Sequence, residues 1–361
     1  MNNSDIRFMF IALRLAHRGL GNVYPNPAVG CVIVKNNDII SRGWTQPGGK
    51  PHAETMAINN AKVNLKGATM YVTLEPCVHY GQTPPCVDAI IRSQIKRVVV
   101  AVQDPDIRVN GSGIKTLKEN GIQVDCGVCE KEAKELNIGY FYVKLLKRPY
   151  VTLKLATTAD GKIATQTGES KWITSAVARK FAHKLRAQND AVMIGTGTLL
   201  KDNPRLNCRL PGLEKYSPVK IISDNKGKLN SSHLILNGKE VITFTNEAEM
   251  AVQHRVIDNK PLENGGVDLI SGIKYIARYG ITRLLIEGGG KLASSLLKDN
   301  IVDNITWIRT SYLAGHDAIS AIHSLNIHHV AELYKFKLRN LRKISGGHIE
   351  TLVAPITNTA A

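Results

Sequence analysis

Hydrophobic positions in the first 150 residues alternate between strand-like and helix-like spacing. Residues Ala68–Leu74 place Met70, Val72 and Leu74 on one face, as in a half-buried strand. Arg97–Gln103 is a continuous apolar run of the kind found in buried strands. The same patterns predict strands at Gly30–Val34, Asp38–Trp44 and Ile122–Val128, and helices at Ala53–Asn60, at Gly113–Asn120, at Glu130–Leu136 and from Cys86 onward.

The second half of the chain repeats this alternation. Thr174 or Ser175 is suited to cap a helix at Ala176–Ala187. Further elements are predicted as strands Tyr150–Ala156, Ala191–Gly195 and Arg283–Ile286 and helix Lys291–Lys298. Because strands alternate with helices, an α/β fold with helix-covered sheets is expected in both halves.

Length and composition favour two globular domains. The 361 residues are 43% hydrophobic and contain no low-complexity tract. We place the boundary at Lys147–Pro149, which gives domains 1–147 and 148–361. No apolar run approaches the ~20 residues of a membrane span, and Met1–Leu15 lacks the apolar core of a signal peptide. A cytoplasmic protein without a membrane partner is therefore expected.

Charge and cysteine content narrow the function only slightly. The net charge of +17 would suit nucleic acid, but the lysines and arginines are scattered, and phosphorylated small molecules or a merely solvated basic surface explain it equally well. We expect no nucleic-acid partner. The six cysteines are expected to be reduced thiols, and Cys126 and Cys129, a single Cys-x-x-Cys pair, to be structural.

Three short fragments carry the residues of a zinc deaminase. His52, Cys77 and Cys86 supply one imidazole and two thiolates, which leave one position of a tetrahedral zinc open for water. Glu54 follows the histidine too closely to be a fourth ligand and can carry a proton from that water to a departing amine. The alternative is that His52 caps a helix and both cysteines are small buried residues, which leaves Glu54 unexplained.

A glycine-rich turn in the second half indicates a phosphate-binding site. Glu287-Gly288-Gly289-Gly290 lies between a predicted strand and a predicted helix, where backbone N–H groups can approach a phosphate. Tight packing is the alternative reason for such glycines. The pattern also differs from the Gly-x-Gly-x-x-Gly of a Rossmann domain, so a dinucleotide needs other support.

The motifs and their spacing resemble those of one protein family. Eight residues separate Cys77 from Cys86, where the common deaminase signature has two. This insert resembles the bifunctional RibD family of riboflavin biosynthesis, and so do the motifs Pro25–Cys31, Val72–Glu75, Asp160–Ala164, Ser170–Ser175, Asp202–Pro204 and Glu287–Gly289. The resemblance covers essentially the whole chain. It implies a cytidine-deaminase-like three-layer N-terminal domain and a dihydrofolate-reductase-like α/β C-terminal domain.

The resemblance also implies an activity and its cofactors. The first domain would use Zn²⁺ to deaminate a diamino-phosphoribosylaminopyrimidine, and the second would use NADPH to reduce the ribosyl side chain to ribityl. Two rivals stay open: a deaminase acting on transfer RNA, and a binding protein that keeps zinc for structure only. The sequence does not set the oligomeric state and leaves a homo-oligomer open.

Site residues follow from the resemblance residue by residue. Contacts to NADPH are implied for Ala156, Trp172, Thr198, Asp202, Gly289, Gly290, Lys291, Leu292, Ala293, Ser294 and Ser295. Contacts to substrate are implied for Asn26, His79 and Asp104 in the first domain and for Lys154, Ser170, Arg186, Leu206, Arg209 and Glu287 in the second.

Three single positions and one residue pair depart from the usual family pattern. Thr45 replaces a histidine, Gln82 a basic residue, Asp106 an asparagine, and Thr158-Ala159 a Ser-Leu pair. The first three put substrate recognition in the first domain in question, because the loss of a cation at position 82 removes one obvious phosphate contact.

Overall fold

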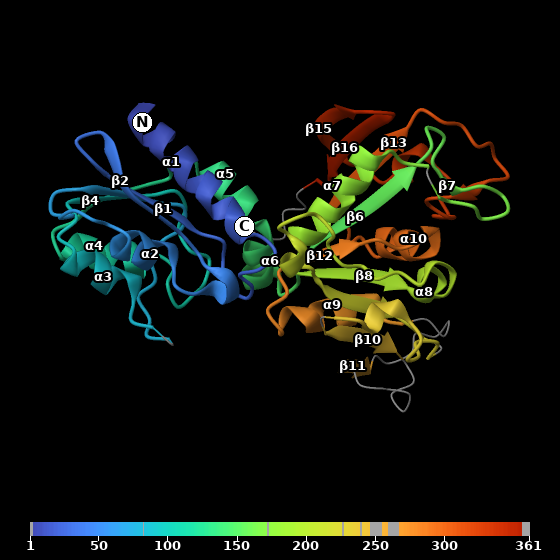
Figure 1. Ribbon diagram of the computed structural model, residues 1–361, viewed down its shortest axis with the longest axis horizontal. Helices are drawn as coiled ribbons and strands as arrows, with labels where there is room; N and C mark the ends of the chain where they lie inside the picture. Colours follow the sequence, from blue (N-terminus) through green and yellow to red (C-terminus); the bar gives the residue numbers. More distant parts are fainter. Residues whose placement is uncertain are drawn as a thin grey trace. The chain divides into compact units, whose positions relative to one another are not determined.

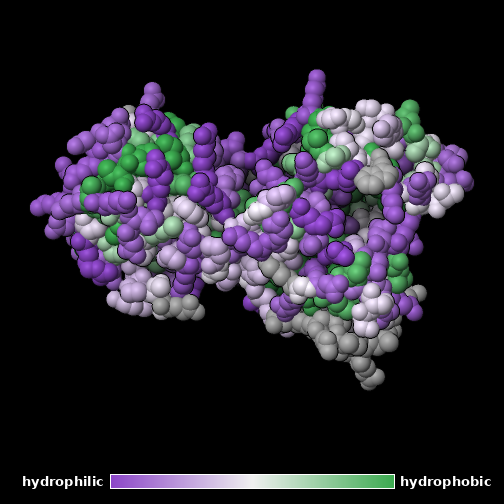
Figure 2. All heavy atoms as spheres, in the orientation of Figure 1, coloured by the Kyte–Doolittle hydropathy of each residue, from purple (hydrophilic) through white to green (hydrophobic). Residues whose placement is uncertain are grey.

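The computed structural model describes residues 3–81, 83–171, 173–225, 227–238, 240–245, 255–258 and 267–355. The chain divides between Lys147 and Arg148 into two compact units, each with its own sheet (Figure 1). Among the described residues, none of the helices has the length and apolar character needed to cross a membrane. The visible face of both units is mostly hydrophilic (Figure 2).

The first unit is built on a five-stranded sheet of order β2-β1-β3-β4-β5. Its strands are β1 Gly30–Lys35, β2 Asp38–Trp44, β3 Thr69–Val72, β4 Arg97–Val100 and β5 Gln123–Cys126. β1 pairs antiparallel with β2 and β3, whereas β3, β4 and β5 are parallel. β3 is shorter than predicted because its partner β1 begins only at Gly30, opposite Thr73.

Helices cover both faces of this sheet and complete three layers. The helices are α1 Asn3–Ala16, α2 Ala53–Asn59, α3 Cys86–Arg92, α4 Ser112–Glu119, α5 Glu130–Leu136 and α6 Ile138–Leu146. Figure 1 shows α1 and α5 on one face and α2, α3 and α4 on the other. A single apolar core runs from Phe8 to Tyr140 and includes the fully buried Val98, Val99 and Val100 of β4.

Two glycines allow helices to lie directly on the sheet. A Cβ on Gly30 of β1 would come within 1.9 Å of the Ala12 carbonyl oxygen in α1. A Cβ on Gly43 of β2 would come within 2.2 Å of the Ala53 carbonyl oxygen in α2. Any larger residue at position 43 would therefore displace the start of α2, the helix that His52 precedes.

The second unit contains a nine-stranded sheet of order β11-β10-β9-β8-β12-β6-β13-β16-β15. Seven strands are parallel: β6 Tyr150–Thr157, β8 Ala191–Gly195, β9 Val219–Ser223, β10 Val241–Thr245, β11 Arg255–Asp258, β12 Arg283–Ile286 and β13 Asn304–Thr310. Antiparallel β16 Gly347–Val353 and β15 Lys337–Ile344 complete one edge. A separate ribbon pairs β7 Lys162–Ala164 with β14 Ile319–Ser320.

The strand order creates a switch point at β12. The chain passes from β8 outward to β11 and then returns to insert β12 between β8 and β6. The helices of this unit are α7 Ala176–Ala187, α8 Thr196–Asp202, α9 Leu269–Ala277 and α10 Gly290–Lys298. The Ser175 hydroxyl accepts the Ala178 N–H, which confirms one of the two predicted caps of α7. Ligands of open α/β sheets bind at such a switch point, beyond the carboxyl ends of the strands.

Candidate functional site

Three element ends bring the predicted zinc ligands together in the first unit. His52 immediately precedes α2, Cys77 follows β3, and Cys86 is the first residue of α3. These three residues form the only cluster of possible metal-ligand side chains found among the described residues.

The donor atoms have the spacing of a tetrahedral zinc site. His52 Nδ1 lies 3.3 Å from Cys86 Sγ and 3.6 Å from Cys77 Sγ, and all three donor atoms lie within 4.8 Å of one another. Zinc–nitrogen and zinc–sulfur bonds at tetrahedral angles place such atoms about 3.6 Å apart. The residues present therefore fit zinc, with one open position.

The geometry argues against a purely structural role for His52. Its imidazole makes no capping hydrogen bond to α2, although the residue occupies the cap position. The ring faces the two cysteines instead. The Cys77 thiol accepts the Cys86 N–H at 3.4 Å, and hydrogen bonds from Cys86 and His52 lower its pKa to about 4. A thiolate is the form that binds metal.

Glu54 lies in the first turn of α2, beside this cluster. Its side chain is 4% exposed, and burial raises the pKa of its carboxyl to about 7. A carboxyl that titrates near neutral pH can both accept and return a proton.

The three substrate residues expected in the first unit lie on loops joined to the metal cluster. The Asn26 side chain packs against Gly49 in the loop that leads to His52. His79 Nδ1 is buried and has no hydrogen-bond partner among the residues described. Asp104 is 6% exposed, its backbone N–H donates to Glu75, and burial raises the pKa of its carboxyl to about 6.

Two departures from the family pattern have local structural roles. The Thr45 hydroxyl accepts the Val29 N–H at 2.9 Å and is buried. The Asp106 carboxylate is paired with Arg108 at 2.6 Å and Lys144 at 2.8 Å, so its negative charge is neutralised. Gln82 lies outside the described residues.

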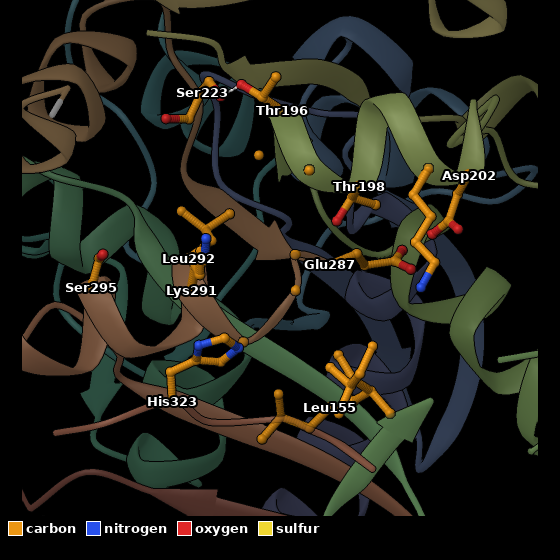
Figure 3. A pocket seen from close by; sticks show the side chains of 18 of the residues that line it. Leu155, Thr196, Thr198, Asp202, Ser223, Glu287, Lys291, Leu292, Ser295 and His323 are labelled. Carbon is orange, nitrogen blue, oxygen red and sulfur yellow. Dashed lines mark hydrogen bonds between the residues drawn. The ribbon is translucent and has the colours of Figure 1, made fainter. Parts of the chain in front are cut away.

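A cavity of about 1030 Å³ opens at the switch point of the second unit. It is bounded by the carboxyl ends of β6, β8, β9 and β12 and by α8 and α10. Figure 3 shows Thr198 and Asp202 of α8, Glu287 after β12 and Ser295 of α10 around it. This is a common place for a nucleotide cofactor in an open α/β fold.

Most residues assigned to the second unit by resemblance line this cavity. These are Lys154, Ala156, Ser170, Thr198, Asp202, Glu287, Gly289, Gly290, Lys291, Leu292 and Ser295. Ala293 and Ser294 lie on the buried side of α10, where the Ser294 hydroxyl bonds to the His323 backbone. Trp172 lies outside the described residues.

Glu287 is the electrostatic centre of this cavity. Arg186 forms a two-pronged ion pair with it at 2.6 and 3.0 Å, and Lys154 Nζ lies 3.7 Å away. Although burial opposes ionisation, these two cations lower the pKa of Glu287 to about 2. Arg186 also donates to the Asn207 carbonyl. Its guanidinium is therefore bound by two groups of the protein, Glu287 and Asn207.

Two further residues expected to contact substrate in the second unit differ in exposure. Leu206 is buried in the apolar core, whereas Arg209 is exposed and its backbone N–H donates to His183.

The glycine-rich turn serves both packing and access. A Cβ on Gly288 would meet Leu292 at 2.6 Å, and one on Gly290 would meet His323 at 2.3 Å. A Cβ on Gly289 would meet only Thr198 Oγ1, at 3.9 Å, and Gly289 lines the cavity. All three glycines line the cavity, but only Gly289 has room for a side chain, because Gly288 and Gly290 pack against Leu292 and His323.

Some residues that line the cavity were not identified from the sequence. Thr196 Oγ1 donates to the Ser223 carbonyl, and Ser223 and Asn225 line the cavity after β9 (Figure 3). The rule that parallel strands end at one edge could have found them. His323 lies on an irregular segment, and no motif or periodicity marked it.

Both halves match known families. Residues 2–102 match the cytidine and deoxycytidylate deaminase zinc-binding region, and residues 149–349 match the RibD C-terminal domain. The riboflavin biosynthesis protein RibD of Aquifex aeolicus is 43% identical over 343 residues, which is 94% of this chain and 96% of the relative.

Solved structures agree over nearly the full length. A diaminohydroxyphosphoribosylaminopyrimidine deaminase/5-amino-6-(5-phosphoribosylamino)uracil reductase from Thermotoga maritima is 36% identical, with a TM-score of 0.89 over 98% of this chain and 99% of that one. Acinetobacter baumannii RibD is 35% identical, with a TM-score of 0.89 over 97% of this chain and 98% of that one. The expected deaminase-like and reductase-like folds are confirmed. The chain belongs to the RibD family and is a bifunctional deaminase and reductase of riboflavin biosynthesis, using zinc in the first activity and NADPH in the second.

Proposed function

We propose that the first unit carries out the deamination at His52, Cys77 and Cys86. The observation that carries this assignment is the spacing of the three donor atoms, 3.3 and 3.6 Å from the imidazole nitrogen to the two sulfurs. Zinc in such a site lowers the pKa of a bound water toward neutrality and makes it a nucleophile.

Glu54 moves the protons of this reaction. Burial beside the ligand cluster raises the pKa of its carboxyl to about 7. The carboxylate can therefore take a proton from the attacking water and give it to the leaving amine. Asn26, His79 and Asp104 bind the pyrimidine substrate. The unpartnered buried nitrogen of His79 supports this assignment, because a bound substrate could supply its missing hydrogen bond.

The cavity of the second unit holds NADPH and the deaminated pyrimidine. NADPH supplies a hydride for the ribosyl carbon. Four lysines line the cavity and provide positive charge for phosphates: Lys154, Lys201, Lys291 and Lys298. Glu287, ionised and fixed by Arg186, accepts hydrogen bonds from the sugar or pyrimidine.

The partner is a phosphoribosyl-pyrimidine, and the reaction takes place in the cytoplasm. The net charge of +17 suits phosphorylated substrates and cofactor without a nucleic-acid partner. Light scattering of the purified protein tests for a homo-oligomer.

Metal analysis of ligand variants tests the assignment of the first site. Cys86→Ser should lose most of the bound zinc and most of the ammonia release, because two protein ligands hold zinc weakly. NADPH oxidation with the deaminated pyrimidine should be unchanged in the same sample. Cys208→Ser, at a buried cysteine of the second unit, is the matched control and should retain zinc. Full zinc retention in Cys86→Ser would contradict the assignment.

A further inference from the structure

One face of the last helix of the first unit carries three polar side chains. Asn137 occupies the position just before α6 without making a side-chain capping bond, and Tyr140 and Lys144 follow at positions i+3 and i+7. This spacing places the three side chains on the same side of the helix. Asn137 and Tyr140 are buried, at 3% and 7% exposure.

This face of α6 contacts two separate substrate loops. The Asn137 amide both donates to and accepts from the Ala28 backbone at 2.9 Å, two residues after Asn26. The Tyr140 hydroxyl donates to Asp104 at 3.1 Å. Lys144 pairs with Asp106 at 2.8 Å. A single helix therefore holds the loops that carry both Asn26 and Asp104.

The Asp104 loop is also tied to the metal-ligand loop. The Glu75 carboxylate, two residues before Cys77, accepts backbone N–H groups of Asp104, Gly111 and Ile114 at 3.1, 2.9 and 3.1 Å. These bonds fix the backbone of Asp104 against Glu75, in the segment that leads to Cys77. They do not orient the Asp104 carboxylate, whose direction depends on the contacts of the side chain itself.

Few groups determine that direction. The Asp104 carboxylate accepts the Asp106 N–H at 2.8 Å and the Tyr140 hydroxyl. Within the described parts of the chain it forms no ion pair, because the nearby cations Arg108 and Lys144 both bind Asp106. Tyr140 is therefore the one side chain seen to donate to it in the described structure.

We infer that Tyr140 is a positioning residue for deamination, which acts by orienting Asp104 toward the pyrimidine substrate. The inference rests on the proposed role of Asp104 in substrate binding. Its consequence is that α6, the last helix before the unit boundary, supports the deaminase substrate site although none of its residues is assigned to substrate binding. Loss of the Tyr140 hydroxyl should weaken substrate binding more than turnover.

The same unit offers a matched control for this bond. The Tyr71 hydroxyl donates to Asp5 at 2.8 Å, again a buried tyrosine on a buried aspartate. Asp5 is also held by Arg97 and lies on α1, which carries none of the substrate or metal residues. Tyr71→Phe therefore removes a similar bond with a structural role only.

The experiment compares Tyr140→Phe and Tyr71→Phe in the full chain by ammonia release from the diaminopyrimidine. Tyr140→Phe should raise KM about tenfold and change kcat by less than about threefold, because a hydrogen bond to a charged group is lost. Tyr71→Phe should lower the melting temperature and leave KM within about twofold of the wild type, as expected for a structural bond.

A double variant tests whether Tyr140 acts through Asp104. In an Asp104→Ala background, which removes the acceptor of the Tyr140 hydroxyl, Tyr140→Phe should change KM by less than about twofold, since coupled residues are not additive. If the wild type is active, an unchanged KM in Tyr140→Phe would overturn the inference and leave the proposed deaminase site standing. A fully additive effect on KM in the double variant would do the same. An inactive wild type would overturn the proposed deaminase site and the inference with it.

Discussion

Buried carboxylates in this protein titrate differently according to whether a cation accompanies them. Glu54 and Asp104 are buried without an ion pair in the described structure, and burial raises their pKa values to about 7 and about 6. Glu287 is equally buried, but Arg186 and Lys154 lower its pKa to about 2. The first unit thus holds carboxyls that can exchange protons, whereas the second holds a permanent anion.

Replacing Glu54 tests its role in proton transfer. Glu54→Gln keeps the size of the side chain and removes the group that carries the proton, so ammonia release should fall by about 10²–10⁴-fold while zinc content is retained. Elemental analysis and an ammonia assay on one sample measure both. Retained ammonia release would assign the proton transfer to another group.

The ionised form of Asp104 should lower the free energy of unfolding at neutral pH. Its folded pKa is raised, so the folded state binds more protons than the unfolded chain between about pH 4 and pH 6, and stability falls as pH rises through this range. Asp104→Asn removes this titration. Its stability relative to the wild type should therefore increase by about 1 kcal/mol between pH 5 and pH 8.

Urea unfolding at the two pH values measures this change. Asp5→Asn is the control of opposite sign, because hydrogen bonds from Arg97 lower the pKa of Asp5. That variant should be destabilised at both pH values, and its deficit should shrink only as pH falls below about 4. A constant difference between Asp104→Asn and the wild type would show that Asp104 does not titrate as inferred.

At the scale of elements, the glycine turn between β12 and α10 combines one open position, Gly289, with two tightly packed ones, Gly288 and Gly290. Gly289→Val adds a side chain that points into open cavity, so it should abolish NADPH binding and oxidation while leaving ammonia release near the wild-type rate. NADPH fluorescence and the two activity assays measure this outcome.

Neighbouring glycines provide the comparison for that variant. Gly288→Ala should instead lower the melting temperature, because its Cβ would collide with Leu292. If Gly289→Val binds NADPH normally, the cofactor must lie elsewhere in residues 150–361.

The elements that carry chemistry were predictable because their signals are local. β2, α5, α7, β8 and β12 have the predicted boundaries, and the proposed zinc ligands lie at element ends that short motifs mark. The role of α6 was not predictable in this way. Tyr140 contacts Asp104 across 36 positions and Asn137 contacts Ala28 across 109, and no local pattern encodes these pairings.

At the scale of the whole molecule, strand order was the feature that sequence patterns could not provide. β12 is inserted between β8 and β6, although long stretches of chain separate it from both. Periodicity identifies a buried strand but not its neighbours in the sheet. The cavity depends on this insertion, since it places Glu287 and the glycine turn beside Lys154 and Thr198.

The first unit should work when separated from the second. The buried residues of its apolar core run from Phe8 to Tyr140, and the metal and substrate residues proposed for it all precede Lys147. A fragment of residues 1–147 should therefore fold, bind zinc and release ammonia without NADPH. Circular dichroism and an ammonia assay test this. A folded, zinc-loaded fragment that stays inactive until the second unit is added would contradict independence of the sites.

The most direct test of two activities in one chain is the mass of the product. Purified protein is incubated with the diamino-phosphoribosylaminopyrimidine, first without and then with NADPH. Without NADPH, the substrate should gain about one mass unit as an amine is replaced by oxygen. With NADPH, it should gain about two more as the ribosyl group is reduced. An unchanged mass under both conditions, with zinc present in the protein, would contradict the account.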